Sequence, residues 1–176
     1  KLKINPIPAL TSCGNPAIEY FTQRDILDEE VKPITELWQL PVVVKILKKQ
    51  QDNGCWKYPG KIREDLRSRE DYDQLETYRI LGELVEKYGL NKNHPQIKNV
   101  AEYFFRCQTP EGDFRGIYGN QYTPTYSSAI MELLIKAGYD DNRIEKGFKW
   151  LLSMRQNDGG WIIPFRTSDI NLKEAL

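Results

Sequence analysis

The feature that most constrains this chain is a short motif that occurs three times. A helix end rich in glutamine is followed by a glycine, and an aromatic residue comes two positions after that glycine. The copies occupy residues 50–56 (QQDNGCW), 108–114 (QTPEGDF) and 155–161 (RQNDGGW), and their glycines are 58 (54 to 112) and 47 (112 to 159) residues apart. Such spacing is typical of stacked supersecondary units. The chain is therefore predicted to be a repeat protein.

Apolar residues upstream of each glycine keep the same register in all three copies. They stand eleven residues before the glycine (Val43, Ala101, Phe148), eight before it (Ile46, Phe104, Leu151) and seven before it (Leu47, Phe105, Leu152). This spacing places them on one face of a helix that ends at the motif. Each copy is thus expected to close a helix with one buried face.

Helical periodicity predicts two kinds of helix between the motifs. Segments 41–50, 95–108 and 142–155 each end at a motif and are expected to be outer helices; 95–108 and 142–155 carry a single apolar stripe. Segments 73–88 and 124–137 carry apolar residues further around the helix and are expected to be inner, buried helices. The predicted fold is all-α, with stacked α-hairpins.

Capping residues sharpen some of these boundaries. Thr123 is expected to cap the helix that follows it, and Asn142 with Glu145 has the spacing of a capping box. A further helix is expected from Asn15 to about Leu27. The charged stretch 57–72 is interpreted as a solvated loop.

The Gln…Gly-x-Trp turns resemble the repeat of squalene–hopene cyclases and protein prenyltransferases, whose Gln-x-x-Asp/Glu-Gly-x-Trp element ends each outer helix. The resemblance covers roughly residues 35–165. That superfamily folds into an α/α toroid with inner helices around a central cavity. The resemblance implies an N-terminal extension with one helix over residues 1–34, followed by an incomplete α/α toroid over 35–176. The third copy departs from the pattern because Arg155 takes the usual glutamine position.

The motif also has a physical interpretation. A buried indole contributes a large apolar area, a glutamine amide can bond backbone groups left open at a helix end, and glycine permits a positive φ. The aromatic residues are therefore expected to act as structural clamps between repeats. The residues assigned to the structural motif are Gln50, Gly54, Trp56, Gln108, Gly112, Phe114, Gln156, Gly159 and Trp161.

Composition excludes several classes of partner. Lys plus Arg and Asp plus Glu are 25 each, so no net charge favours nucleic acid, and no apolar run is long enough to span a bilayer. The three cysteines are an odd number in unrelated surroundings, which favours reduced thiols in a cytoplasmic protein. Cys55 and Cys107 are expected to be inert packing residues.

Catalytic groups of the resembled families are scarce. A squalene–hopene type cyclase protonates an alkene with an Asp-x-Asp-Asp acid, and the nearest sequences here are Asp71-Tyr72-Asp73 and Asp140-Asp141. Asp73 is a weak catalytic candidate, with a helix N-cap as the alternative interpretation. A prenyltransferase zinc site needs Asp, Cys and His, but no Asp-x-Cys occurs and His94 is the only histidine. No metal and no cofactor are therefore expected.

Aromatic residues near the starts of the inner helices are the other candidates. Their rings could bind an apolar ligand or stabilise a cationic intermediate, and the alternative is that they pack between helices. The ligand-cavity candidates are Tyr72, Tyr78, Arg115, Tyr118, Tyr122 and Tyr126.

Three functional hypotheses remain open, and whether the chain is an enzyme is undecided. The favoured one is a prenyltransferase/squalene-cyclase-like repeat module that is non-catalytic as it stands and binds an apolar, isoprenoid-like ligand or a protein partner. An alternative is a fragment of an active terpenoid cyclase or prenyltransferase whose catalytic residues lie outside this chain. A more remote one is a sugar-active toroid using Glu111 and Asp113. A closed toroid needs about six hairpins, so self-association or the remainder of a larger toroid is expected.

Overall fold

The computed structural model describes residues 4–117 and 121–161. The described chain is built from helices, and an isolated β-bridge joins Gln108 and Phe114. The elements are α1 (Ile7–Thr11), α2 (Pro16–Phe21), the π-helix η1 (Thr22–Ile26), α3 (Thr35–Trp38), α4 (Pro41–Leu47), α5 (Arg69–Gly82), the π-helix η2 (Glu83–Lys87), α6 (Pro95–Cys107), α7 (Pro124–Lys136) and α8 (Asn142–Ser153). The all-α prediction is confirmed.

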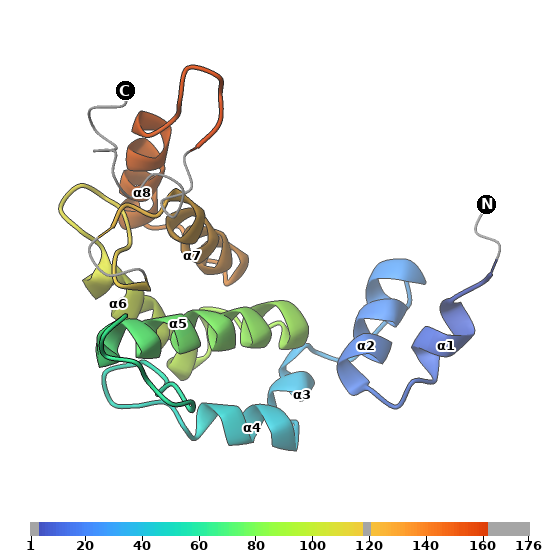
Figure 1. Cartoon of the computed structure of the whole chain (residues 1–176). Helices are drawn as coiled ribbons and strands as arrows, with labels where there is room; N and C mark the ends of the chain where they lie inside the picture. The colour runs from blue at the N-terminus through green and yellow to red at the C-terminus, as the bar shows by residue number, and fades with distance from the viewer. Residues whose placement is uncertain (1–3, 118–120, 162–176) are drawn as a thin grey trace.

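The helices after residue 34 form hairpins that stack side by side (Figure 1). Helix α5 with η2 pairs with α6, α7 pairs with α8, and α7 contacts both α5 and η2. In Figure 1, α5 and α7 border the open angle of the molecule, whereas α4, α6 and α8 lie on its outer side. The arrangement has the inner and outer helices expected of a toroid segment.

Capping explains where the inner helix α5 begins. The Ser68 hydroxyl accepts a hydrogen bond from the Asp71 N–H, and the Asp71 carboxylate accepts one from the Ser68 N–H, which completes a capping box. Helix α5 therefore begins at Arg69, inside the stretch interpreted as a loop. Asp73 lies within the first turns of the helix and is not its cap.

Two other caps differ from the expected ones. Helix α8 is capped by Asp141, whose carboxylate accepts a hydrogen bond from the Arg143 N–H, in place of Asn142 with Glu145. Thr123 occupies the N-cap position of α7, but its hydroxyl donates to the Phe114 carbonyl, 3.3 Å away. Its side chain thus holds the second turn against α7 and leaves the helix end without a side-chain cap.

The N-terminal segment holds two α-helices where one was expected. Asn15 caps α2 as its sequence position indicated, with its side-chain oxygen accepting from the N–H groups of Ala17 and Ile18. The additional helix α1 follows Asn5, whose side-chain oxygen accepts from the Ile7 N–H. In Figure 1, α1 and α2 project as an arm from the remaining helices.

The glutamine of each of the first two turns forms two hydrogen bonds. The Gln50 amide nitrogen donates to the Gly54 carbonyl at 3.1 Å and to the Gln96 carbonyl at 2.9 Å. The Gln108 amide nitrogen donates to the Gly112 carbonyl at 2.8 Å and to the Arg143 carbonyl at 2.8 Å. Each glutamine therefore closes its own turn and also holds the first turn of the following outer helix.

The glycines permit this close approach. Gly54 and Gly112 have φ values of +89° and +120°. A Cβ atom on Gly112 would lie 2.6 Å from the Lys146 carbonyl oxygen, and one on Gly54 would overlap the Asn99 carbonyl oxygen. Because these carbonyls belong to α8 and α6, each glycine lies directly against the next outer helix.

The aromatic residues of the first two turns are enclosed. Trp56 and Phe114 are fully buried. The Trp56 N–H donates to the Thr77 hydroxyl on α5 at 2.9 Å, and the Phe114 N–H donates to the Ser127 hydroxyl on α7 at 3.0 Å. Each turn is thus bonded to the next inner helix as well as to the next outer one.

Within the described residues, the third turn keeps the local bonds of the motif. Arg155 Nε donates to the Gly159 carbonyl at 3.0 Å, as the glutamine amide does in the other copies. Gln156, assigned to the motif from the sequence, instead donates to the Met154 carbonyl. Trp161 donates to the Leu151 carbonyl, yet 41% of its surface is exposed. Arg155 is therefore the residue that closes the third turn.

Substituting two equivalent glycines should separate the cost of backbone strain from the cost of a repeat contact. Gly159→Ala places a Cβ at φ +88° with only the flexible Arg155 side chain nearby, so we expect a loss of about 1–2 kcal/mol. Gly112→Ala adds an overlap with the Lys146 carbonyl, and we expect it to cost about 2 kcal/mol more. Urea unfolding of both variants measures the difference. Equal losses at the two positions would contradict the role of Gly112 in stacking.

Candidate functional site

The carboxylate of Asp73 is bound by two neighbouring groups. Its Oδ1 atom accepts a hydrogen bond from the Tyr58 N–H at 2.7 Å and lies 3.4 Å from the Arg69 Nε. The backbone carbonyl of Asp73 accepts from the Thr77 hydroxyl at 2.6 Å. The hydrogen bond from Tyr58 ties the chain after the first turn to the start of α5, whereas the contacts with Arg69 and Thr77 lie within that helix.

Tyr72 lies beside the same loop. Its ring packs against Tyr58 with 5.0 Å between ring centroids, and its hydroxyl oxygen accepts a hydrogen bond from the Arg63 N–H at 3.3 Å. Tyr72 therefore covers residues 58–63. The described contacts pair it with Tyr58, a residue that the sequence did not single out.

Tyr78 and Tyr126, two of the predicted ligand-cavity residues, contact each other. Tyr78 comes from α5 and Tyr126 from α7, and their rings meet edge to face with 5.5 Å between centroids. Both side chains are half-buried. Burial raises the pKa of the Tyr78 hydroxyl above its usual value, so this hydroxyl stays protonated at neutral pH. The pair joins two adjacent inner helices.

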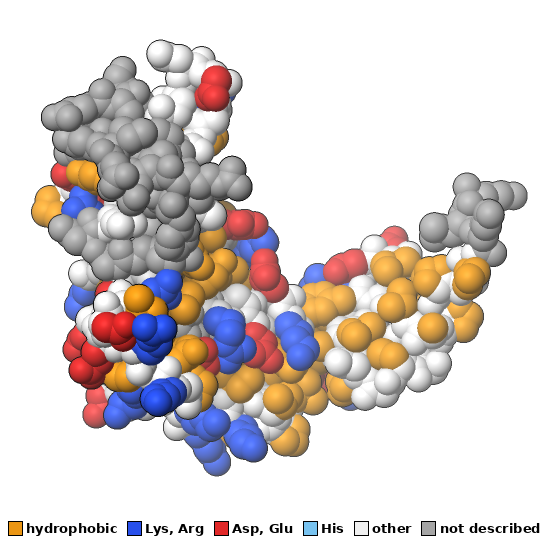
Figure 2. Space-filling view, in the orientation of Figure 1, with side chains coloured by type: hydrophobic (Ala, Val, Ile, Leu, Met, Phe, Trp, Pro, Cys, Tyr) orange, Lys and Arg blue, Asp and Glu red, His pale blue; other side chains and the backbone are white. Residues whose placement is uncertain are grey.

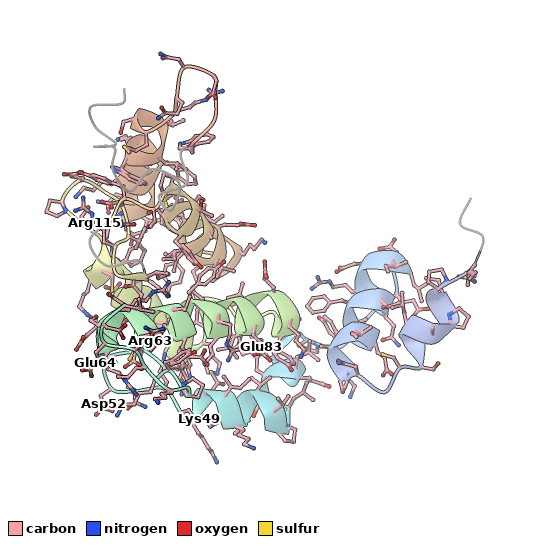
Figure 3. All side chains as sticks on the ribbon, in the orientation of Figure 1. Lys49, Asp52, Arg63, Glu64, Glu83 and Arg115 are labelled. Carbon is pink, nitrogen blue, oxygen red and sulfur yellow. The ribbon has the colours of Figure 1, made fainter. Side chains whose placement is uncertain are left out.

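Arg115 and Tyr122 belong to a second group, at the turn that precedes α7. The Arg115 guanidinium binds the buried Asp113 carboxylate at 2.8 Å and the Glu111 carboxylate at 3.4 Å. It also lies 4.4 Å above the Tyr122 ring, which stacks on Trp150 at 6.2 Å. Figure 3 shows Arg115 well away from Glu83 on the far end of α5/η2.

The geometry disfavours a glycosidase-like role for Glu111 and Asp113. Both carboxylates bind the same arginine, and Asp113 is fully buried with a further hydrogen bond to Thr109. A carboxylate held in this way cannot reach a sugar substrate without breaking those bonds. Tyr118, another predicted cavity residue, lies outside the described residues.

Charged residues continue the surface beyond the tyrosine pair. Lys136 on α7 lies 2.6 Å from a Glu86 oxygen and 2.7 Å from a Glu132 oxygen, and Arg79 lies 3.4 Å from Glu83. Figure 2 shows blue and red side chains gathered along the open angle of the molecule, where Figure 3 places Glu83. The surface shared by α5, η2 and α7 is therefore aromatic at the tyrosine pair and ion-paired towards the helix C-termini.

His94, Cys55 and Cys107 belong to residue types that can act as nucleophiles or metal ligands. In this structure they are packed against, or hydrogen-bonded to, neighbouring residues. His94 caps α6 through its ring nitrogen and packs its ring edge to face on Trp38. Burial raises the pKa of Cys107 to about 11 and also raises the pKa of Cys55, so both thiols are protonated at neutral pH. Over residues 4–117 and 121–161, no three His, Cys, Asp or Glu side chains group as a metal site would require. Within the same ranges no helix has the length and apolar character to cross a membrane.

Comparison with known proteins agrees with the geometry of the turns. Residues 67–168 match the family model of the squalene-hopene cyclase C-terminal domain. The chain is also 28% identical over 79 residues to the squalene–hopene cyclase of Zymomonas mobilis, a match that covers 44% of this chain and 12% of that protein. No solved structure matches the chain significantly. The family match takes in more than half of the chain, including helices α5 to α8 and the second and third turns. The chain therefore belongs to the squalene-hopene cyclase C-terminal domain family.

Proposed function

We propose that this chain is a squalene-cyclase-like repeat module that forms part of the wall of a site for an apolar, isoprenoid-like ligand, and that it supplies no catalytic acid of its own. The observation that carries the proposal is the Tyr78–Tyr126 pair. It presents two half-buried aromatic rings from adjacent inner helices at one place. Aromatic rings with apolar flanks are typical of sites that hold flat or extended apolar molecules.

The non-catalytic part of the proposal is supported by the surroundings of the acidic candidates. A catalytic acid that protonates an alkene must be protonated and must face its substrate. Asp73 instead accepts a hydrogen bond from the Tyr58 N–H and lies beside the Arg69 cation. Asp141 caps α8 and binds Arg143, and these interactions lower its pKa. Both carboxylates are thus engaged by donors of the protein itself.

A second candidate function is suggested by the extent of the match to the Zymomonas mobilis enzyme. Because the alignment covers 12% of that protein, a longer relative has ample chain for catalytic residues. In that case this chain would be the repeat scaffold of an active terpenoid cyclase or prenyltransferase, and the proposed aromatic wall would face a substrate that other residues activate.

Removing one ring of the pair should weaken binding of an isoprenoid probe. We expect Tyr126→Ala to lower the affinity for farnesol roughly tenfold, because an aromatic contact contributes about 1 kcal/mol or more. Tyr126→Phe should keep the affinity, since the ring remains. Isothermal titration calorimetry of the 176-residue chain with farnesol measures both effects.

Tyr20→Ala is the matched control for this experiment. Tyr20 packs edge to face on Phe21 in the N-terminal arm, away from α5 and α7, so its loss should leave farnesol binding unchanged. Absence of farnesol binding to the unsubstituted chain would overturn the ligand site. Conversion of squalene to a cyclic product by this chain alone, detected by gas chromatography, would overturn the non-catalytic part.

Substitution of Asp73 should reduce stability. We expect Asp73→Ala to lower the free energy of unfolding by about 1–3 kcal/mol, because the half-buried Tyr58 N–H loses its acceptor. Asp73→Asn should cost less, since an amide oxygen can still accept that hydrogen bond. Urea unfolding monitored by circular dichroism tests this. Unchanged stability in Asp73→Ala would show that the carboxylate has no positioning role.

A further inference from the structure

An open hollow of about 500 Å³ lies between two links that join inner to outer helices. Its lining residues come from the link before α6, from α6 itself and from the link between α7 and α8, and they are Lys92, Asn93, Lys98, Glu102 and Tyr139. Sites for small molecules are commonly of about this size, roughly 300–1,000 Å³. None of these residues belongs to the predicted ligand cavity. Because most of them are polar or charged, the hollow suits a polar ligand.

The link between α7 and α8 supports the side chain of Lys92. The Lys92 N–H donates a hydrogen bond to the Ala137 carbonyl at 2.8 Å, which holds the two links together. The Cγ, Cδ and Cε atoms of Lys92 lie 3.7–3.8 Å from the position that a Cβ atom would occupy at Gly138. The aliphatic stem therefore runs along Gly138, next to Tyr139. A stem supported in this way loses less conformational entropy when its ammonium group binds a ligand.

Lys98 has a carboxylate at a suitable spacing but does not pair with it. Glu102 stands four residues later on α6, where oppositely charged side chains can meet. Its two oxygens instead accept hydrogen bonds from the Arg143 guanidinium, at 2.9 Å each, and this pairing lowers the pKa of Glu102. Over residues 4–117 and 121–161, neither Lys92 nor Lys98 has an ion-pair partner. Two ammonium groups at one hollow are thus left without a counter-charge.

The local charge stays positive when the acidic neighbours are counted. Arg143 binds both Glu102 and Asp141, so this group has two negative charges and one positive charge. Lys92 and Lys98 bring two further positive charges to the same hollow. The positive charges therefore exceed the negative ones by one. Both carboxylates are already bound by Arg143, which leaves the lysines to an anion from solution.

We propose that this hollow binds the phosphate group of a small organic phosphate. A phosphomonoester carries nearly two negative charges at neutral pH and has three strong acceptor oxygens, so a single group can pair with both lysines. A carboxylate carries one charge and matches one of them. The hollow is larger than a phosphate group, which leaves room for an organic part beside the Tyr139 ring and the Asn93 amide. This site does not depend on the proposed apolar ligand.

Removing either lysine should weaken phosphate binding. We expect phenyl phosphate, titrated at constant ionic strength into the ¹⁵N-labelled 176-residue chain, to shift the backbone amide signals of the lining residues. Lys92→Gln and Lys98→Gln should each lower the affinity roughly fivefold, as expected for loss of one ion pair. Both side chains are exposed, so the fold should tolerate the changes. Lys149→Gln removes the same charge from an exposed position on α8 outside the hollow, and it should leave the affinity unchanged.

Two further probes distinguish the possible ligands. Phenyl phosphate should bind more tightly than inorganic phosphate, because its ring can pack against Tyr139. Equal or tighter binding of inorganic phosphate would overturn the assignment to an organic phosphate. Acetate binding as tightly as phosphate, or an equal loss of affinity in Lys149→Gln, would show a general attraction of anions and overturn the site. Unchanged affinity in both Lys92→Gln and Lys98→Gln would overturn it as well. None of these readouts involves farnesol.

Discussion

The second hydrogen bond of the motif glutamine is the interaction on which the stack depends. One amide nitrogen carries two hydrogens, and in Gln108 one goes to the Gly112 carbonyl and the other to Arg143 on the next outer helix. Closing the turn and docking the following helix are therefore coupled through a single group. Gly112 makes the coupling possible, because any side chain there would hold α8 too far away for the amide to reach it. The buried aromatic then seals the junction from water.

The architecture could be predicted from the sequence because the motif and the spacing of apolar residues indicate the same helices. Segments 95–108 and 124–137 correspond within one residue to α6 and α7, since Pro opens each helix and the apolar stripe runs to its end. The beginning of α5 was harder to predict. Its first turn is charged, as in a loop, and a capping box between Ser68 and Asp71 sets the boundary instead of hydrophobicity. Local hydrogen bonds of this kind do not change the spacing of apolar residues from which the helices were predicted.

The candidate site could be predicted one residue at a time, but its grouping could not. Tyr78 and Tyr126 were identified separately, whereas their contact depends on how far α7 is displaced along α5, which the sequence does not encode directly. Trp150 was overlooked as the partner of Tyr122, although an alignment signal existed. It stands nine residues before its glycine, where the second repeat has Tyr103, so both copies place an aromatic ring at that position.

Three aspartates of this chain make structural contacts. In this chain Asp73 holds a loop, Asp113 binds an arginine and Asp141 caps a helix. The carboxylates of Glu86 and Glu132 act electrostatically on the Tyr78 hydroxyl, and both are ion-paired with Lys136. In the proposed site, the residues that hold the helices together are therefore different from those that would act on a ligand. Under the proposed function, changes on the exposed inner faces of α5 and α7 would alter ligand preference while the Gln–Gly–aromatic turns keep the helices in place.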